Sequence, residues 1–410
     1  MDPLEKITPE REAVSEQVHL TPANSLPRSF RFGAVRPAPE VFGAPTPPSL
    51  GPLAAFVGNW VGNGFNTIFR PDSPVTPTPL PTPAGGDNVL ELNLTSESLS
   101  FSPSLGSVPN RGMVQADAFL NGVPYLQAIS DVTAGASVGI HLEPGLWVIA
   151  PSTADPTEPS TLVRMASIPH GTTITAQGTW TTFAGPPTIP PVDITPFGAI
   201  DAGGTLPPSP SRIRFPSQTL TSLDTARIPQ DLTAFNAAGT ITQAILDDPN
   251  TILRNSLAGQ TITSTTQISI STAPASPLFG GGADNIAFLL GNASALTDPK
   301  LGVQNAQTLE MLATFWIETV QHTILVPFFQ PGERPMRLRP QNRLPGQPSP
   351  TFLVDPPFPI TKPRRITFTS TQIQYSQLVM LNFNGLSWPH VSVATLVPAE
   401  ATPVPPSAWA

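Results

Sequence analysis

The sequence predicts a mainly β protein built on an antiparallel barrel or sandwich. Short runs of alternating apolar and polar residues follow one another over residues 53–183, and no helical pattern separates them. Proline accounts for 54 of the 410 residues and clusters between these runs. Proline-rich loops join strands where the missing N–H does least harm. Asn-Gly pairs at 121–122 and 384–385 add two candidate hairpin turns.

Composition narrows the possible function classes. Hydrophobic residues make up 39% of the chain, enough for a sizeable core, whereas charged residues make up 12% and the net charge is −8. The absence of a stripe of basic and aromatic residues argues against nucleic-acid binding. There are no cysteines, which excludes disulfides, thiolate ligands and cysteine nucleophiles. A polar N-terminus without a secretory signal, and no apolar run long enough for a membrane span, predict a cytoplasmic protein.

The chain divides into five expected segments. They are an extended tail over 1–44, the first part of a β-barrel over 45–183, an insert of loops and short helices over 184–308, closing strands over 309–398, and a C-terminal tail over 399–410. Within the insert, residues 231–260 have helix-like apolar spacing that Asp248-Pro249 interrupts, which predicts two short helices. One expanded barrel and two fused barrels both remain possible, and the oligomeric state cannot be inferred.

The stretch 366–397 predicts a hairpin in detail. If Asn384 and Gly385 form a type I′ turn, the pairing of the two strands can be counted outward from the turn. The expected pairs are Phe383 with Leu386, Leu381 with Trp388, Val379 with His390, Gln377 with Ser392, and Tyr375 with Ala394. Because strand side chains alternate between faces, the side chains of these pairs from Tyr375 to Trp388 share one face. That face carries the His390 imidazole beside the small residues Ser392 and Ala394.

Two interpretations of His390 follow from the residues alone. It either lines a ligand cavity or is a core histidine bonded to a neighbour such as Gln377. Other candidates are His141, which shares a strand face with Glu143, and His170 in a turn. His141 and Glu143 could act as general acid and base, but no nucleophile motif accompanies them.

The densest basic stretch contains Arg334, Arg337, Arg339 and Arg343. A solvated, proline-rich loop is the favoured interpretation of this stretch. A clamp for carboxylates or propionates is the alternative, because guanidinium groups suit planar anions.

The order of several motifs resembles the nitrobindin-type haem-binding barrel family. These motifs are GNWVGNGF near the start, HLEPGLW in the middle, the IPHG turn, and PHVSVATL near the end. The matching positions are Trp60, Gly62, Gly64, His141, Glu143, Gly145, Trp147, Pro169, Gly171 and His390. The resemblance covers about residues 53–183 and 364–398. The chain departs from the family by a long insert, by Val61 after the tryptophan, and by a final strand one residue longer.

The resemblance implies a ten-stranded, calycin-like antiparallel barrel that binds haem b. The axial iron ligand would be His390, its ring oriented by Gln377 or Ser392. The other implied cofactor-binding residues are Trp388, Tyr375, Trp60, His141 and His170, together with Gln377. The implied chemistry acts on nitric oxide, peroxynitrite or peroxides. Two alternatives are a calycin-like carrier of a fatty acid or other hydrophobic ligand, and a structural protein such as a coat subunit.

Overall fold

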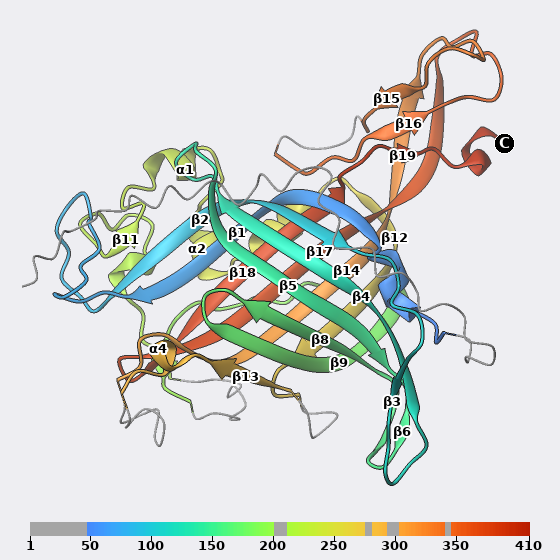
Figure 1. Cartoon of the computed structure of the whole chain (residues 1–410). Coiled ribbons are helices and arrows are strands. Elements are labelled where there is room, and N and C mark those ends of the chain that lie inside the picture. The colour runs from blue at the N-terminus through green and yellow to red at the C-terminus, as the bar shows by residue number, and fades with distance from the viewer. Residues whose placement is uncertain (1–46, 201–210, 275–280, 293–302, 341–345) are drawn as a thin grey trace, which may run out of the picture.

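The computed structural model describes residues 47–200, 211–274, 281–292, 303–340 and 346–410. Ten antiparallel strands in these ranges close into one barrel, in which each strand pairs with the next along the chain and the last returns to the first (Figure 1). The predicted antiparallel barrel is confirmed, and it is a single barrel. Its strands are β1 (Gly58–Pro71), β2 (Asn88–Phe101), β4 (Ala118–Asp131), β5 (Val138–Ala150), β8 (Thr161–Ile168), β9 (Thr172–Ala184), β12 (Thr261–Ser271), β14 (Gln307–Val326), β17 (Arg364–Phe383) and β18 (Leu386–Pro398).

Shorter elements decorate the barrel. The short strands are β3 (Val108–Asn110), β6 (Thr153–Ala154), β7 (Thr157–Glu158), β10 (Phe197–Gly198), β11 (Arg227–Ile228), β13 (Gly282–Asn285), β15 (Met336–Leu338), β16 (Phe352–Val354) and β19 (Thr402–Pro403). The helices are α1 (Thr233–Ala237), α2 (Gln243–Asp247), α3 (Thr251–Leu257) and α4 (Ala287–Leu290), with 3₁₀ turns η1 (Gly51–Ala55), η2 (Pro216–Gln218) and η3 (Pro406–Trp409). No helix of the described ranges is long and apolar enough to cross a membrane.

One end of the barrel, which we name the packed end, is filled by aromatic side chains. Phe56, which follows η1, is fully buried and stacks on Phe101 with ring centroids 4.7 Å apart. Trp147 and Phe315 meet edge to face at 5.2 Å in the same cluster. Such pairs contribute beyond the area that they bury. This end of the interior therefore has a solid core, and any ligand space must lie at the other end.

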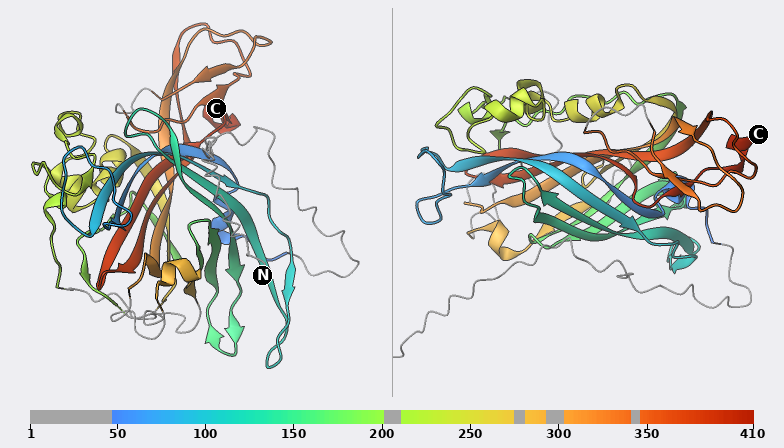
Figure 2. Two further views of the ribbon diagram at one scale, coloured as in Figure 1. Left: turned by 60° about the vertical axis from the view of Figure 1, so that its left-hand side comes forward. Right: turned by 90° about the horizontal axis from the view of Figure 1, so that it is seen from above.

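An outer layer formed by residues 189–200 and 211–257 covers one side of the barrel (Figure 2). The break predicted at Asp248-Pro249 is confirmed, because α2 ends at Asp247 and α3 begins at Thr251. The helix α1, before them, was not predicted. Ile245 and Leu253 of α2 and α3 are buried in one apolar cluster with the outward-facing Val391 and Val393 of β18. The outer layer thus seals the back of the strand that carries His390.

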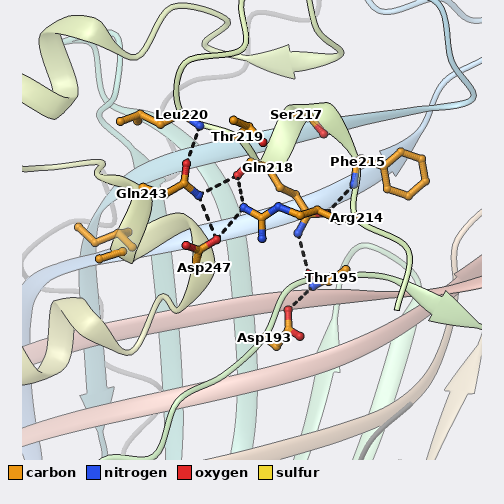
Figure 3. Close-up of polar contacts among 12 residues, drawn as sticks. Asp193, Thr195, Arg214, Phe215, Ser217, Gln218, Thr219, Leu220, Gln243 and Asp247 are labelled. Carbon is orange, nitrogen blue, oxygen red and sulfur yellow. Dashed lines mark hydrogen bonds and ion pairs between the residues drawn. The ribbon is translucent and has the colours of Figure 1, made fainter. Parts of the chain in front are cut away.

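Polar side chains hold the loops of this layer together (Figure 3). Arg214 donates to the Asp247 carboxylate at 2.7 Å and to the Gln218 carbonyl at 3.0 Å. Gln243 donates to the same carbonyl and the same carboxylate, each at 3.0 Å. The Gln218 side chain in turn donates to Thr195 at 2.9 Å. These contacts satisfy loop groups that no strand pairs, so the cluster is structural.

A small lobe continues from the packed end (Figures 1 and 2). The outer parts of β14 and β17 run beyond the barrel as a two-stranded ribbon, and the small sheet β15–β16–β19 packs on that ribbon. Phe352 and Phe368 meet edge to face at 4.6 Å in the lobe core. His322 is buried there and bonds to Ser370 at 2.8 Å, a structural role for that histidine.

The predicted segments map onto this architecture as follows. The expected tail over 1–44 lies outside the described residues. The segment 184–308 supplies the outer layer and also one barrel strand, β12. The segment 309–398 supplies both the closing strands and most of the lobe, and residues 399–410 pack on the lobe through β19 and η3.

Candidate functional site

The β17–β18 hairpin positions His390 as the sequence predicts. Asn384 and Gly385 have φ angles of +48° and +71°, both in the left-handed region that a type I′ turn requires. All five predicted pairs occur, including Val379 with His390 and Gln377 with Ser392. At Tyr375 and Ala394 the shared face points into the barrel, because both belong to the interior core cluster. Leu381 and Trp388, which were expected on the same face, instead belong to the apolar cluster of the outer layer.

His390 lies at the end of the barrel opposite the packed end, which we name the histidine end. The turns between β4 and β5, β8 and β9, and β17 and β18 lie at this end. His390, Gln377 and Val379 face inward and are nevertheless only half-buried. Solvent therefore enters the barrel here and reaches at least to the level of Gln377.

The direct partner of His390 is Asn66 of β1. The amide nitrogen of Asn66 lies 2.6 Å from Nε2 of His390 and also donates to Ser392 at 2.7 Å. Asn93 of β2 donates to the Asn66 carbonyl oxygen at 3.2 Å. Gln377 and Ser392 were the expected partners of the His390 ring, but the hydrogen bond to Nε2 comes from Asn66. Gln377 instead accepts a hydrogen bond from Arg164, and Ser392 accepts one from Asn66.

Three predicted histidines gather at the histidine end. The rings of His141 and His170 stack with centroids 5.6 Å apart. Burial, followed by the charges of the nearby His141 and His170, lowers the pKa of His390 to about 3. Burial, followed by the effect of His141, also lowers the pKa of His170. At neutral pH the His390 ring is thus a neutral imidazole, the form that ligates metals.

A buried ion pair joins the neighbouring strands β5 and β8 inside the barrel. Arg164 of β8 donates to Glu143 of β5 at 2.5 Å and to the Tyr125 hydroxyl at 2.9 Å. The other oxygen of Glu143 lies 3.2 Å from Nε2 of His141, and Arg164 also donates to Gln377 at 2.7 Å. Burial opposes ionisation of Glu143, but Arg164, His141 and the hydrogen bond from Tyr125 together outweigh burial and lower the pKa of Glu143 to about 2.

A second buried carboxylate, Glu97 of β2, lies beside this pair. It accepts hydrogen bonds from Tyr375 at 2.6 Å and from Thr95 at 2.9 Å, and Gln127 lies within 3.4 Å. Burial raises the pKa of Glu97 to about 6, although these hydrogen bonds favour its ionised form. Glu97 has no cationic partner comparable to Arg164. The two carboxylates therefore differ by several pKa units for an identifiable physical reason.

The small residues of the matching motifs make room for this network. A Cβ added to Gly64 would lie 2.8 Å from both the Glu97 carboxylate and the Ala394 methyl group. A Cβ added to Gly145 would lie 2.4 Å from the Tyr125 ring. In the middle of the barrel the Glu97 carboxylate and the Tyr125 ring approach these glycines closely, so the glycines leave no ligand space there.

Not all predicted site residues meet there. Tyr375 and Gln377 belong to the polar network in the middle of the barrel. Trp60 lies at the packed end, where its indole donates to the Phe56 carbonyl at 2.7 Å. Trp388 is fully buried, and its ring stacks on Phe383 with centroids 4.5 Å apart. Only His141, His170 and His390 converge on the open end.

The arginine stretch lies far from His390. Arg337 is in β15 of the lobe, with Arg334 and Arg339 beside it, and the lobe extends from the packed end (Figure 1). Arg343 lies outside the described residues. The alternative of a propionate clamp at the histidine end therefore has no structural basis in the described arginines.

Sequence reasoning missed Asn66, Glu97 and Arg164. Each could have been found by extending the period-two alternation of a strand already singled out. Asn66 follows Trp60, Gly62 and Gly64 on one face of β1, and Arg164 shares a face with Leu162 of β8. What alternation could not reveal is which of these polar side chains would pair across the barrel.

Comparisons with known proteins leave the family open. No family model matches the chain, and no curated protein matches it significantly. Among solved structures, a match is the crystal structure of Rv2717c from M. tuberculosis, with 9% identity and a TM-score of 0.31. The match covers 86% of this chain and 97% of that chain. Similarity at this level identifies neither family nor function.

Proposed function

We propose that the histidine end of the barrel binds a b-type haem with His390 as the axial ligand. The observation that supports this most directly is a neutral, inward-facing imidazole at the end where solvent enters the barrel. A single neutral imidazole is the donor that axial ligation of haem requires. A site for a bare metal ion is less well supported, because the described residues contain no group of three or more suitable His, Asp or Glu side chains.

The residues at the histidine end fit a haem on one condition. The hydrogen bond from Asn66 occupies Nε2 of His390, so Asn66 must release that atom for it to ligate iron. Asn66 has an alternative acceptor in Ser392 at 2.7 Å, which makes the release inexpensive. His141 and His170 would then line the rim. A bound ferric haem would supply a coordination position for nitric oxide, peroxynitrite or a peroxide.

A fatty-acid carrier is the weaker alternative. A carrier of a long alkyl chain needs a continuous apolar cavity. Here Glu143 and Arg164 place buried charges in the barrel interior, Arg164 reaches Gln377 of β17 from β8, and aromatic side chains fill the packed end. An alkyl chain that entered past His390 would have to displace or separate these buried charges, which is costly.

Hemin titration of the purified protein tests the proposal. We expect a Soret band that saturates at one hemin per chain, and its loss or shift in His390→Ala with recovery on adding free imidazole. The control is His322→Gln, since His322 is a buried histidine of the lobe and glutamine can still bond to Ser370. A spectrum that is identical in the wild type and His390→Ala, or no binding at all, would refute the proposal.

A further inference from the structure

Positive charge is concentrated in one part of this acidic protein. The described residues 327–340 and 346–365 contain six basic and two acidic residues, a net charge of +4, whereas the whole chain has 20 basic and 28 acidic residues and a net charge of −8. The rest of the chain is therefore strongly negative. The described residues 327–340 and 346–363 form the lobe together with the ends of β14 and β17. The lobe thus has the opposite charge to the rest of the chain.

The outer end of the lobe carries three of these cations. Val326, the last residue of β14, pairs with Arg364, the first residue of β17, so the ribbon ends at this pair. The residues just after Val326 and just before Arg364 therefore lie at the outer end of the lobe. Arg334, Lys362 and Arg365 belong to this end, which we name the lobe tip, and all three are exposed. None of the ion pairs between described residues involves them.

Large apolar side chains are exposed beside these cations. Leu325 pairs directly with Arg365 on the outer face of the ribbon and is 38% exposed. Phe328, in the loop after β14, is 66% exposed, whereas the adjacent Phe329 is buried in the lobe core. The lobe tip therefore combines unpaired cations with an aromatic and an aliphatic side chain that solvent does not favour.

We propose that the lobe tip docks on a membrane surface that contains anionic phospholipid. Guanidinium and ammonium groups bind lipid phosphates and carboxylates, and exposed Phe and Leu side chains enter the boundary between headgroups and acyl chains. A nucleic acid would also attract the cations, but it offers no apolar layer for Leu325. The partner chemistry that uses both kinds of side chain is an anionic lipid surface.

Co-sedimentation of the full-length protein with vesicles tests the docking. The protein is expected to pellet with phosphatidylcholine vesicles that contain phosphatidylserine and to stay in solution with phosphatidylcholine alone, and high salt should release it. The triple variant Arg334→Glu, Lys362→Glu and Arg365→Glu should bind at least about tenfold more weakly. Phe328→Ser should weaken binding while leaving its salt dependence unchanged.

A matched control separates local from general charge effects. Arg111→Glu changes the net charge as much as Arg334→Glu does, but Arg111 lies on the β3–β4 hairpin outside the lobe. Arg334→Glu should weaken vesicle binding and Arg111→Glu should not. The proposal is overturned if both variants bind like the wild type, if vesicles with and without phosphatidylserine pellet equal amounts, or if the protein retains a duplex oligonucleotide and no vesicle.

Discussion

Asn66 and His390, 324 positions apart in the chain, meet inside the barrel with 2.6 Å between the amide nitrogen and Nε2. Because an amide nitrogen only donates, this contact places the proton of the neutral imidazole on Nδ1. Asn66 is in turn fixed by Ser392 and Asn93. The first and last strands of the barrel, β1 and β18, thus hold His390 jointly. The tautomer of the His390 ring therefore depends on the pairing of these two strands.

Replacing Asn66 with aspartate should raise the pKa of His390. A carboxylate close to a ring nitrogen favours the protonated imidazole, and an opposite charge within a few ångströms shifts a pKa by about 1–3 units. The starting value is about 3 because of burial and the neighbouring histidines. The chemical shift of the ring Cε1 proton, followed against pH, measures the change.

Asn63→Asp is the matched control for this substitution. Asn63 is exposed on the outer face of the same strand and bonds to the Gly346 carbonyl. The titration of His390 should therefore be the same in Asn63→Asp as in the wild type. Equal His390 titration in the wild type and Asn66→Asp would mean that the two side chains do not meet.

Replacing Glu97 with glutamine should change how stability depends on pH. The folded-state pKa of about 6 lies above the ordinary value of 4.5, so the stability contributed by protonated Glu97 is complete below 4.5 and is lost as the pH rises through 6. The variant lacks this loss. Its free energy of unfolding relative to the wild type should rise by about 2 kcal/mol between pH 4 and pH 8, as urea denaturation measures.

His390→Gln should show the opposite dependence and so provides an internal control. The folded-state pKa of His390 lies below its ordinary value of 6.5, so the unfolded chain binds the proton first and wild-type stability falls as the pH drops from 6.5 towards 3. The variant escapes that loss. If the free energies of unfolding of the two variants, each relative to the wild type, change with pH in the same direction, the assigned directions of the Glu97 and His390 pKa shifts are wrong.

The hairpin could be predicted from the sequence in detail because local chemistry determines it. A type I′ turn at Asn384-Gly385 and a period of two fix every pair from Phe383 to Tyr375, and no distant residue is needed. The barrel fold could also be predicted from local sequence patterns. Regular strand spacing without intervening helices leaves few other ways to bury one face of each strand.

The polar interior could not be predicted, because it depends on contacts between strands far apart in the chain. Tyr375 was expected beside a cofactor, but it bonds to Glu97, 278 positions away. The small residues beside His390, such as Ala394, were interpreted as room for a ligand, whereas the Ala394 methyl group and the Glu97 carboxylate both lie 2.8 Å from the Cβ position of Gly64. A sequence shows that a residue is small but does not show which side chain fills the gap.

Gly385→Ala should destabilise the protein through the turn. The φ angle of +71° lies in the left-handed region, where a residue with a Cβ costs about 1–2 kcal/mol. Gly198→Ala is the matched control, because Gly198 pairs with Leu386 beside the same turn and has open space at its Cβ position. Thermal unfolding should lower the melting temperature of Gly385→Ala only. An equal effect of both substitutions would contradict the turn assignment.

Arg164→Met should be strongly destabilising, because it leaves the Glu143 carboxylate buried without its cation. Removing one partner of a buried ion pair costs about 3–5 kcal/mol, and replacing both partners is often close to neutral. Adding Glu143→Gln to Arg164→Met should therefore restore much of the lost stability. The control Arg111→Met removes an exposed ion pair with Asp117 and should cost less than about 1 kcal/mol. Urea denaturation of the four proteins decides the matter: a double variant no more stable than Arg164→Met would show that Arg164 acts through packing rather than through the charge of Glu143.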